Sequence, residues 1–261
     1  KSSNIKEWSD MKGKKVAKTP GTPLTTKATL CFLAFGGLTE KDVEQVVVSG
    51  TSGAYDALID GTLDGAYMPF EGASSYTLES SPRGLRWLEM DPNDAEGWAR
   101  LQKLMPYGPY LSKTGAGCSE DNPVQGAGYN MGFFLFKDGN PDIAYEISKA
   151  IYEGYDYYKD MSADLVYWDE AMLLNYEKQI FPMHEGTVRF LKEIGKWTPD
   201  LENWQTWKVK QEEGRINAWP KFLKDTQDKN IQPGSEEFLI MWEEYLWQND
   251  LMSTPSKAPI L

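Results

Sequence analysis

Residues 19–26, Thr-Pro-Gly-Thr-Pro-Leu-Thr-Thr, combine several hydroxyl groups with the turn residues Pro and Gly. The segment joins an expected strand to an expected helix, and the first turn of a helix presents backbone N–H groups that have no intrahelical partner. Those N–H groups, together with the hydroxyls of Thr22, Thr25 and Thr26, suit a carboxylate or a phosphate. The alternative is structural, because Thr22 followed by Pro23 is also a common way to start a helix.

One wall of the same site is predicted at the end of the expected strand at residues 63–68, where large apolar and aromatic residues follow one another. Aromatic residues near strand ends or in loops are better candidates for ligand contacts than aromatic residues at helical spacing, which usually face a core. We therefore expect a ligand site made of Thr19, Gly21, Thr22, Thr25, Thr26, Tyr67, Met68, Pro69, Phe70 and Tyr129.

His184 is the only histidine, and Glu185 follows it directly. A metalloprotease motif needs a second histidine four residues later, but that position is Val188. No Gly-x-Ser-x-Gly elbow, Walker loop or dinucleotide fingerprint is present. We therefore interpret His184 as a structural residue at a helix start, and we expect no catalytic residue, no metal and no cofactor. One alternative stays open, a periplasmic hydrolase or lyase in which His184 works with Glu185 or Glu193 as an acid–base pair.

Two cysteines, Cys31 and Cys118, lack the close spacing of a zinc site or a redox motif. They form either a single disulfide or free thiols, with Cys31 on an apolar helix face. The C-terminal tryptophans give a second alternative function, a carbohydrate-binding or interaction module with an exposed aromatic platform. Its members would be Trp204, Trp207, Trp219, Trp242 and Trp247.

The secondary structure expected to position these residues changes along the chain, from alternating strands and helices to helices alone. Apolar and β-branched runs predict strands at residues 15–17, 46–48, 63–68, 85–90 and 129–136, and helices at 24–35, 51–59 and 94–104. Asp91 is the expected cap of the last of these helices. From residue 141 the periodicity is helical, with helices at 141–161, 163–177, 187–195, 201–226 and 235–249, and Pro220 should break or kink the fourth.

Length, net charge and apolar content limit the classes of molecule that the chain can bind. The 261 residues are long enough for two α/β lobes, and the formal net charge of −12 opposes nucleic acids and anionic membranes. The longest apolar stretch, residues 30–35, is far too short to span a bilayer, so direct membrane insertion is not expected. The sequence begins at Lys1 and contains no signal-peptide pattern, so we expect any targeting segment to have been removed, and localisation cannot be deduced from a leader.

Four stretches, taken in order, resemble periplasmic binding proteins: residues 10–16, 21–22, 37–43 and 57–66. Residues 181–190, Phe-Pro-Met-His-Glu-Gly-Thr-Val-Arg-Phe, followed by Lys-Glu-Ile-Gly at 192–195, are similar to the Pro-x-His-x-Gly-Ala helix entry of the TAXI branch of TRAP-transporter solute receptors. The resemblance covers about residues 5–195, and the later Trp-rich helices resemble a C-terminal extension of some members.

The resemblance implies an α/β, periplasmic-binding-protein-like two-lobed clamp with a helical C-terminal extension. Residues 1–90 would form the ligand-binding second lobe, residues 91–200 the rest of the clamp, and residues 201–261 the extension. The implied function is capture, in the periplasm or another extracytoplasmic space, of a small carboxylate-bearing ligand (an amino acid, a dicarboxylate or a 2-oxoacid) for the permease subunits of a TRAP transporter.

Two departures from the branch lead to further expectations. Family members often carry Gly-Ser-Gly-Thr at the second-lobe turn, where this chain has Pro-Gly-Thr-Pro at residues 20–23, so the ligand need not be the usual one. Members also open with a Gly-Gly-x-Tyr-Tyr stretch that does not precede Lys1. We therefore expect another chain, an N-terminal segment or a dimer partner to cover the apolar faces of residues 144–151 and 188–194.

Overall fold

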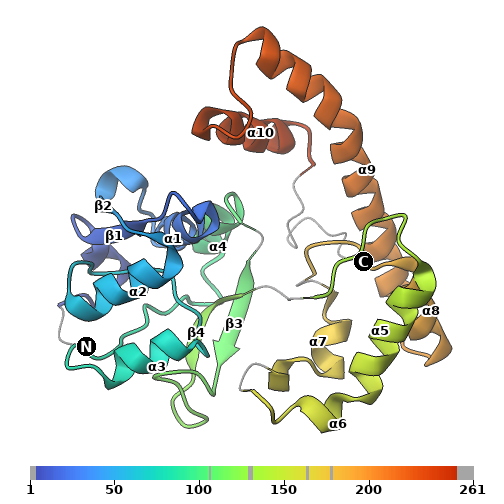
Figure 1. Cartoon of the computed structure of the whole chain (residues 1–261), viewed down its shortest axis with the longest axis horizontal. Coiled ribbons are helices and arrows are strands. Elements are labelled where there is room, and N and C mark those ends of the chain that lie inside the picture. Colours follow the sequence, from blue (N-terminus) through green and yellow to red (C-terminus); the bar gives the residue numbers. More distant parts are fainter. Residues whose placement is uncertain (1–3, 106, 129–131, 163–164, 177–178, 252–261) are drawn as a thin grey trace. The chain divides into compact units, whose positions relative to one another are not determined.

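The computed structural model describes residues 4–105, 107–128, 132–162, 165–176 and 179–251 (Figure 1). Its contacts divide the chain into two compact units. The N-terminal unit comprises Lys1–Tyr129 and Tyr158–Tyr167, and the C-terminal unit comprises Asn130–Tyr157 and Trp168–Leu261. These boundaries differ from the expected domains 1–90, 91–200 and 201–261, which stay a prediction about domain organisation.

The N-terminal unit mixes helices with two small sheets. Its elements are β1 (Lys15–Lys18), α1 (Pro23–Phe35), β2 (Glu44–Val47), α2 (Gly50–Asp60), α3 (Ala73–Ser80), α4 (Ala95–Gln102), β3 (Gly108–Ser112) and β4 (Val124–Gly128). Short 3₁₀ helices occupy Trp8–Met11, Glu40–Asp42 and Leu165–Tyr167. The mixed α/β class expected from the sequence is confirmed for this unit.

β1 and β2 pair in parallel on either side of α1 in the sequence, so the predicted βαβ unit is confirmed. Val16 of β1 pairs with Gln45 of β2 and also forms a parallel bridge with Gly65. This bridge is what the structure has in place of the predicted strand at residues 63–68. Because all three segments run in the same direction, their carboxyl ends meet at one edge.

Two apolar clusters fix α1 and α2, the first by packing α1 against α4 and the second by packing α2 against the segment that follows it. Ala28, Cys31 and Phe35 of α1 pack with Trp98 and Leu101 of α4, and all five are buried. A second cluster places buried residues of α2 against the segment that follows it: Ala54, Ala57, Leu58, Leu63 and Met68. The helices therefore have fixed positions, and so do the loops at their N-terminal ends.

Two further expectations for the N-terminal unit are wrong, and one pair of strands was not predicted. The cap of α4 is Asp94, whose side chain accepts the N–H of Gly97, rather than Asp91. Residues 85–90 form no strand, although the N–H of Met90 donates to the carbonyl of Gln125 at 3.0 Å. The antiparallel pair β3–β4 was not predicted at all, because β3 contains Gly108 and Pro109 and β4 contains Gly126 and Gly128.

The predicted buried strand at residues 129–136 is also wrong over its described part. Residues 129–131 lie outside the described residues, and residues 132–136 form no strand. Phe133 and Phe136 are 67% and 87% exposed. An apolar run indicates burial only when a neighbouring element covers it, and no element among the described residues covers this one.

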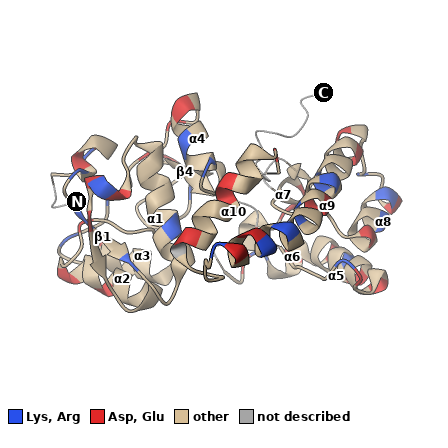
Figure 2. Ribbon diagram, turned by 90° about the horizontal axis from the view of Figure 1, so that it is seen from above, with Lys and Arg blue, Asp and Glu red and all other residues tan. Residues whose placement is uncertain are grey.

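The C-terminal unit is helical. Its helices are α5 (Pro141–Glu153), α6 (Tyr155–Tyr158, whose last residue falls in the N-terminal unit), α7 (Glu170–Leu174), α8 (Glu185–Glu193), α9 (Pro199–Asp228) and α10 (Glu236–Gln248). Figure 2 shows Lys and Arg interspersed with Asp and Glu along α9, whereas α10 holds acidic side chains and no basic one among residues 236–248. The helical C-terminal half expected from periodicity is confirmed.

α5 and α8 bury each other, which corrects the expectation that their apolar faces need another partner. Phe190 and Leu191 of α8 are 1% and 0% exposed, and Ala144 of α5 is 4% exposed. The Phe190 ring contacts the rings of Tyr145 and Tyr152 at centroid distances of 5.8 and 5.6 Å. The two faces are therefore covered within the unit itself.

Two expected helices differ in length. α9 runs through Pro220 without ending, so of the predicted break or kink at Pro220 the break is wrong and the kink stays a prediction. The predicted helix at residues 163–177 is limited, in its described part, to the 3₁₀ turn Leu165–Tyr167 and to α7, which starts where the Asp169 side chain accepts the N–H of Met172. A side-chain cap fixes a new start, so one long periodic segment becomes two short elements.

The C-terminal tryptophans do not form the exposed platform of the alternative hypothesis. Trp204 is 2% exposed, and Trp207, Trp242 and Trp247 are half-buried. Trp219 is 37% exposed, but its ring stacks on Phe222 and meets Trp242 edge-on at 4.9 Å. The rings of Trp219 and Trp242 join α9 to α10, whereas Trp204 packs against Tyr176.

Candidate ligand-binding site

The candidate site lies where β1 and β2 end and α1 and α2 begin. The turn of residues 19–22 follows β1 and leads into α1, and Ser49 follows β2 and occupies the N-cap position of α2. Both helices therefore begin at the carboxyl edge of the parallel pair, with their first-turn N–H groups at that edge. The N-terminal ends of helices carry partial positive charge, which favours an anion there.

Hydrogen bonds among threonines shape the turn. The backbone N–H of Thr19 donates to Oγ1 of Thr26 at 2.8 Å, and the Thr19 hydroxyl donates to the carbonyl of Thr22 at 3.0 Å. The hydroxyls of Thr25 and Thr51 are 2.9 Å apart, which ties the start of α1 to the start of α2. Thr19, Thr25 and Thr26 thus use their hydroxyls to hold the turn in place.

Thr22 is different from its neighbours. It occupies the N-cap position of α1, yet its side chain makes no capping hydrogen bond. Its Oγ1 is buried and has no hydrogen-bond partner among the described residues. A buried polar atom without a partner costs about 1–3 kcal/mol, so the arrangement favours a group that bonds this hydroxyl. Gly21 lies beside it with nothing within 4 Å of where a Cβ would stand.

The predicted wall divides into supporting and accessible residues. Met68 and Phe70 are 6% and 9% exposed and belong to the interior, with the Phe70 ring 4.6 Å from that of Trp87. Tyr67 is half-buried against Phe32, and Pro69 is exposed. Tyr129 lies outside the described residues. Of the wall, Tyr67 and Pro69 therefore present surface, and the ligand contacts themselves stay a prediction.

Ser49 and Thr51 were missed by the sequence analysis. They belong to a second hydroxyl-bearing turn between a strand and a helix, Ser49-Gly50-Thr51, and Gly50 adopts φ +68° there. The same signal that pointed to residues 19–26 was present at residues 49–51. What was not visible is that the two turns meet, which depends on the parallel pairing of β1 with β2.

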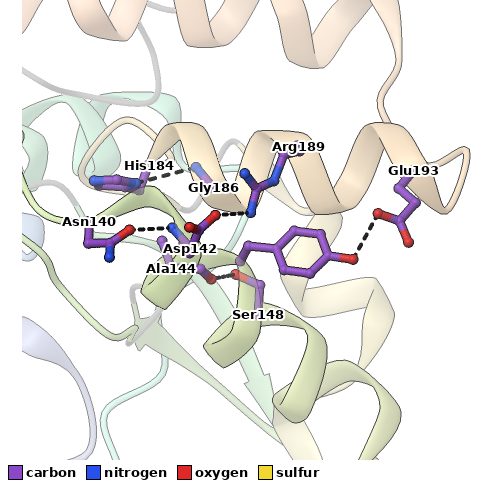
Figure 3. Close-up of polar contacts among 9 residues, drawn as sticks. Asn140, Asp142, Ala144, Ser148, His184, Gly186, Arg189 and Glu193 are labelled. Atoms are coloured by element: carbon purple, nitrogen blue, oxygen red, sulfur yellow. Dashed lines mark hydrogen bonds and ion pairs between the residues drawn. The ribbon is translucent and has the colours of Figure 1, made fainter.

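His184 is a helix cap, as expected. Its Nδ1 accepts the N–H of Gly186 at 3.3 Å at the start of α8 (Figure 3). Glu185 is exposed, and Glu193 accepts the hydroxyl of Tyr145 at 2.8 Å. Nε2 of His184 is buried and has no hydrogen-bond partner within the described ranges. Neither glutamate is hydrogen-bonded to the histidine in the geometry of an acid–base pair.

The cysteines are both free thiols, which resolves the alternative in favour of no disulfide. Burial raises the pKa of the Cys31 thiol to about 12, so it stays protonated in the core. Over the part of the chain that is described, no three His, Cys, Asp or Glu side chains are arranged to hold a metal ion. In that same part, no helix is both long and apolar enough to cross a membrane.

Comparison with protein-family models gives a match over most of the chain. Residues 1–195 match the model of a family described as the NMT1-like family. No curated protein matches the chain. The matched region includes both strand–helix turns of the candidate site and ends just before α9, so α9 and α10 lie outside it.

Proposed function

Because the chain belongs to the NMT1-like family, a periplasmic-binding-protein-like family related to the solute-binding proteins of transporters, we propose that it captures a small carboxylate at the start of α1. The observation that carries this proposal is the buried, unpartnered hydroxyl of Thr22 at the N-terminus of α1. Proteins of such families usually work outside the cytoplasm, and we propose an extracytoplasmic location for this one.

The proposed binding mode follows from the geometry of the turn. The ligand carboxylate accepts hydrogen bonds from the backbone N–H of Leu24 and from the Thr22 hydroxyl, where the helix end favours negative charge. Pro23 has no N–H, and the N–H of Thr25 already donates to the carbonyl of Thr22 at 2.9 Å. The Thr25–Thr51 bond keeps the starts of α1 and α2 together, so little ordering is required on binding. Tyr67 and Pro69 then form the accessible part of the wall.

The resemblance to the TAXI branch extends the proposal to one class of transporter. The Pro-Met-His-Glu-Gly segment at residues 182–186 supports the TAXI branch, because its histidine caps α8 in the structure. On this basis we infer a two-lobed clamp that delivers its ligand to the permease subunits of a TRAP transporter. The protein would then act by binding, with no catalytic step.

The proposal is tested by titration calorimetry with a panel of dicarboxylates, amino acids and 2-oxoacids. Thr22→Val removes the hydroxyl but keeps the shape, and we expect it to weaken binding of the tightest compound about tenfold or more, because one hydrogen bond to a charged group is lost. Thr206→Val is the matched control, since Thr206 is an exposed threonine of α9 with a backbone hydrogen bond of its own.

Two outcomes would overturn the proposed site. In the first, no member of the panel binds to the folded protein. In the second, a compound binds, but Thr22→Val and Thr206→Val bind it as tightly as the unmodified protein. The second outcome would leave a binding protein whose site lies elsewhere.

A further inference from the structure

α10 carries apolar residues around most of its circumference. Apolar or aromatic side chains occupy residues 238–242 and 245–247 of this helix. One side packs against α9, where the rings of Phe238 and Trp242 lie 5.2 and 4.8 Å from the ring of Phe222. A helix that buries only one stripe normally presents polar residues on its other side, whereas a helix that is apolar all round is covered on both sides.

The side of α10 that faces away from this packing has two exposed apolar side chains. Leu239 and Ile240 are 48% and 51% exposed, whereas Phe238 is 4% exposed. With 3.6 residues per turn, they lie about 100° and about 200° around the helix axis from Phe238. Glu243 and Glu244 come four residues after them, so each glutamate lies beside one of the two apolar side chains.

The same side of the helix is acidic. Residues 230–256 contain Asp and Glu but no Lys, Arg or His. Glu237 and Glu244 are exposed, and neither forms a salt bridge with another described residue. Figure 2 shows this difference in charge between α10 and α9, which carries both signs. A surface with charges of one sign attracts a partner of the opposite sign.

We call the set Glu237, Leu239, Ile240, Glu243 and Glu244 the outer face of α10. Covering its apolar side chains requires an apolar stripe, and Lys or Arg beside that stripe would pair with the glutamates, as flanking charges do in coiled coils. A second copy of the outer face would bring carboxylates against carboxylates, which is unfavourable. Nucleic acids and anionic membranes are repelled for the same reason.

We propose that the outer face of α10 docks a basic amphipathic helix of a partner protein. Leu239 and Ile240 contact the apolar stripe of that helix, and Glu237 and Glu244 pair with its Lys and Arg side chains. α10 lies outside the family match, so this interaction is additional to ligand capture. It uses no residue of the candidate ligand-binding site, and its test is independent of the proposed function.

The test uses a fluorescently labelled synthetic peptide with leucine on one helical face and lysine on the other. One control peptide has glutamate in place of lysine, and a second has the same composition in an order that distributes leucine around the helix. Fluorescence anisotropy with the full chain, in about 0.15 M salt, should show that the basic amphipathic peptide binds about tenfold or more tighter than either control.

Two double variants locate the binding on α10. Leu239→Ser with Ile240→Ser should weaken binding of the basic amphipathic peptide about tenfold or more, because the apolar contacts are lost. Glu237→Gln with Glu244→Gln should weaken it as well and reduce its dependence on salt, because two exposed carboxylates are removed. Near-ultraviolet circular dichroism checks that both variants keep the native packing.

Val47→Ser with Ile143→Ser is the matched control, since it removes two exposed apolar side chains from β2 and α5 and should leave the affinity unchanged. The inference is overturned if the basic amphipathic peptide binds no tighter than its controls, or if the Leu239–Ile240 double variant binds it as tightly as the matched control. Sedimentation velocity on the protein alone tests the other occupant. A dimer that the same double variant dissociates would assign the outer face to a second copy and overturn the proposal.

Discussion

Lys208 of α9 is a fully buried cation. Its Nζ donates to the carbonyl of Ile180 at 3.0 Å and lies 5.7 and 5.3 Å from the ring centroids of Trp204 and Trp207. Burial lowers the pKa of Lys208 from 10.5 to about 8, because the charged form loses its hydration. The carbonyl and the two rings offset only part of that loss.

This pKa predicts how stability changes with pH. Between about pH 8 and 10.5 the unfolded chain binds a proton that the folded protein has released, so the free energy of unfolding rises with pH in this window. Lys208→Met lacks this titration. Relative to that variant, the unmodified protein should gain about 2–3 kcal/mol between pH 7 and pH 10 in urea unfolding. If the difference in the free energy of unfolding between the two proteins stays constant with pH, Lys208 does not titrate in this window.

Gly186 lies at the crossing of α5 and α8 (Figure 3). A Cβ at this position would stand 2.7 Å from the backbone nitrogen of Tyr145 and 2.9 Å from Cβ of Ala144. Gly186→Ala should therefore push the helices apart and lower the free energy of unfolding by about 1–3 kcal/mol. Gly132→Ala, where nothing lies within 4 Å, is the control. Equal stability of the two variants would contradict the close packing.

Single residues were predictable from sequence only where their partners are local. The turn of residues 19–26 and the cap at His184 were recognisable because their partners lie within a few residues, whereas the ligand contacts expected of the threonine hydroxyls stay a prediction. The hydroxyl of Thr25 bonds Thr51, and Glu71 meets Tyr110, across long stretches of sequence. Those contacts depend on how the elements pair, so the sequence alone could not indicate which hydroxyl is left unpartnered.

At the scale of elements, Pro220 lies inside α9, a helix of 30 residues. Proline lacks the N–H that would bond the carbonyl of Ile216, and Ile216 is 58% exposed, so water can take that place. The sequence predicted a break or a kink, and packing on both sides of the proline keeps the helix continuous. Phe222, 3% exposed against Phe238 and Trp242, fixes the part that follows it.

Pro220→Ala should stabilise α9, since it restores one helical hydrogen bond and removes the ring clash. We expect an increase of about 1–3 kcal/mol in the free energy of unfolding, with slower hydrogen exchange at residues 216–224. Lys221→Ala, an exposed neighbour in the same helix, should change stability by less than about 0.5 kcal/mol. A destabilised Pro220→Ala protein would mean that the proline fixes a bend on which the packing of α10 depends.

Helices and strands were predictable where the spacing of apolar residues agrees with the turn residues that end the element. The βαβ unit and α2 were found because strand, helix and a terminal glycine coincide, with Gly61 at φ 89° ending α2. β3 and β4 were not found, because their pairing compensates for residues with poor strand propensity. The exposed run at residues 132–136 was taken for a strand on hydrophobicity alone, which carries no information about neighbours.

At the scale of the whole molecule, the family match stops at residue 195, but the matched region is in contact with residues that lie beyond it. Gln205 of α9 accepts the N–H of Met183 at 2.8 Å and donates to the carbonyl of the same residue at 2.7 Å. Lys208 bonds the carbonyl of Ile180 in the same segment. α9 therefore stabilises the approach to α8, within the matched region, although it lies outside the family match.

A chain truncated after Gly195 should consequently lose the cooperative unfolding of its C-terminal unit, because residues 180–183 lose their partners and buried Trp204 is removed. A chain truncated after Lys229 keeps these contacts and loses only α10 and its aromatic packing, so it should unfold cooperatively at lower urea. Near-ultraviolet circular dichroism during urea unfolding distinguishes the two. Native-like cooperativity in the shorter chain would contradict a supporting role for α9.

The central claim is that a carboxylate binds at the start of α1, and amide chemical shifts measured during a titration test it directly. With the tightest compound of the panel, the account predicts the largest saturable shifts at the amides of Leu24, Thr25 and Thr51, with smaller ones near Tyr67. The affinity from those shifts should agree with calorimetry. Shifts confined to the C-terminal unit, or none at residues 22–26, would contradict the claim.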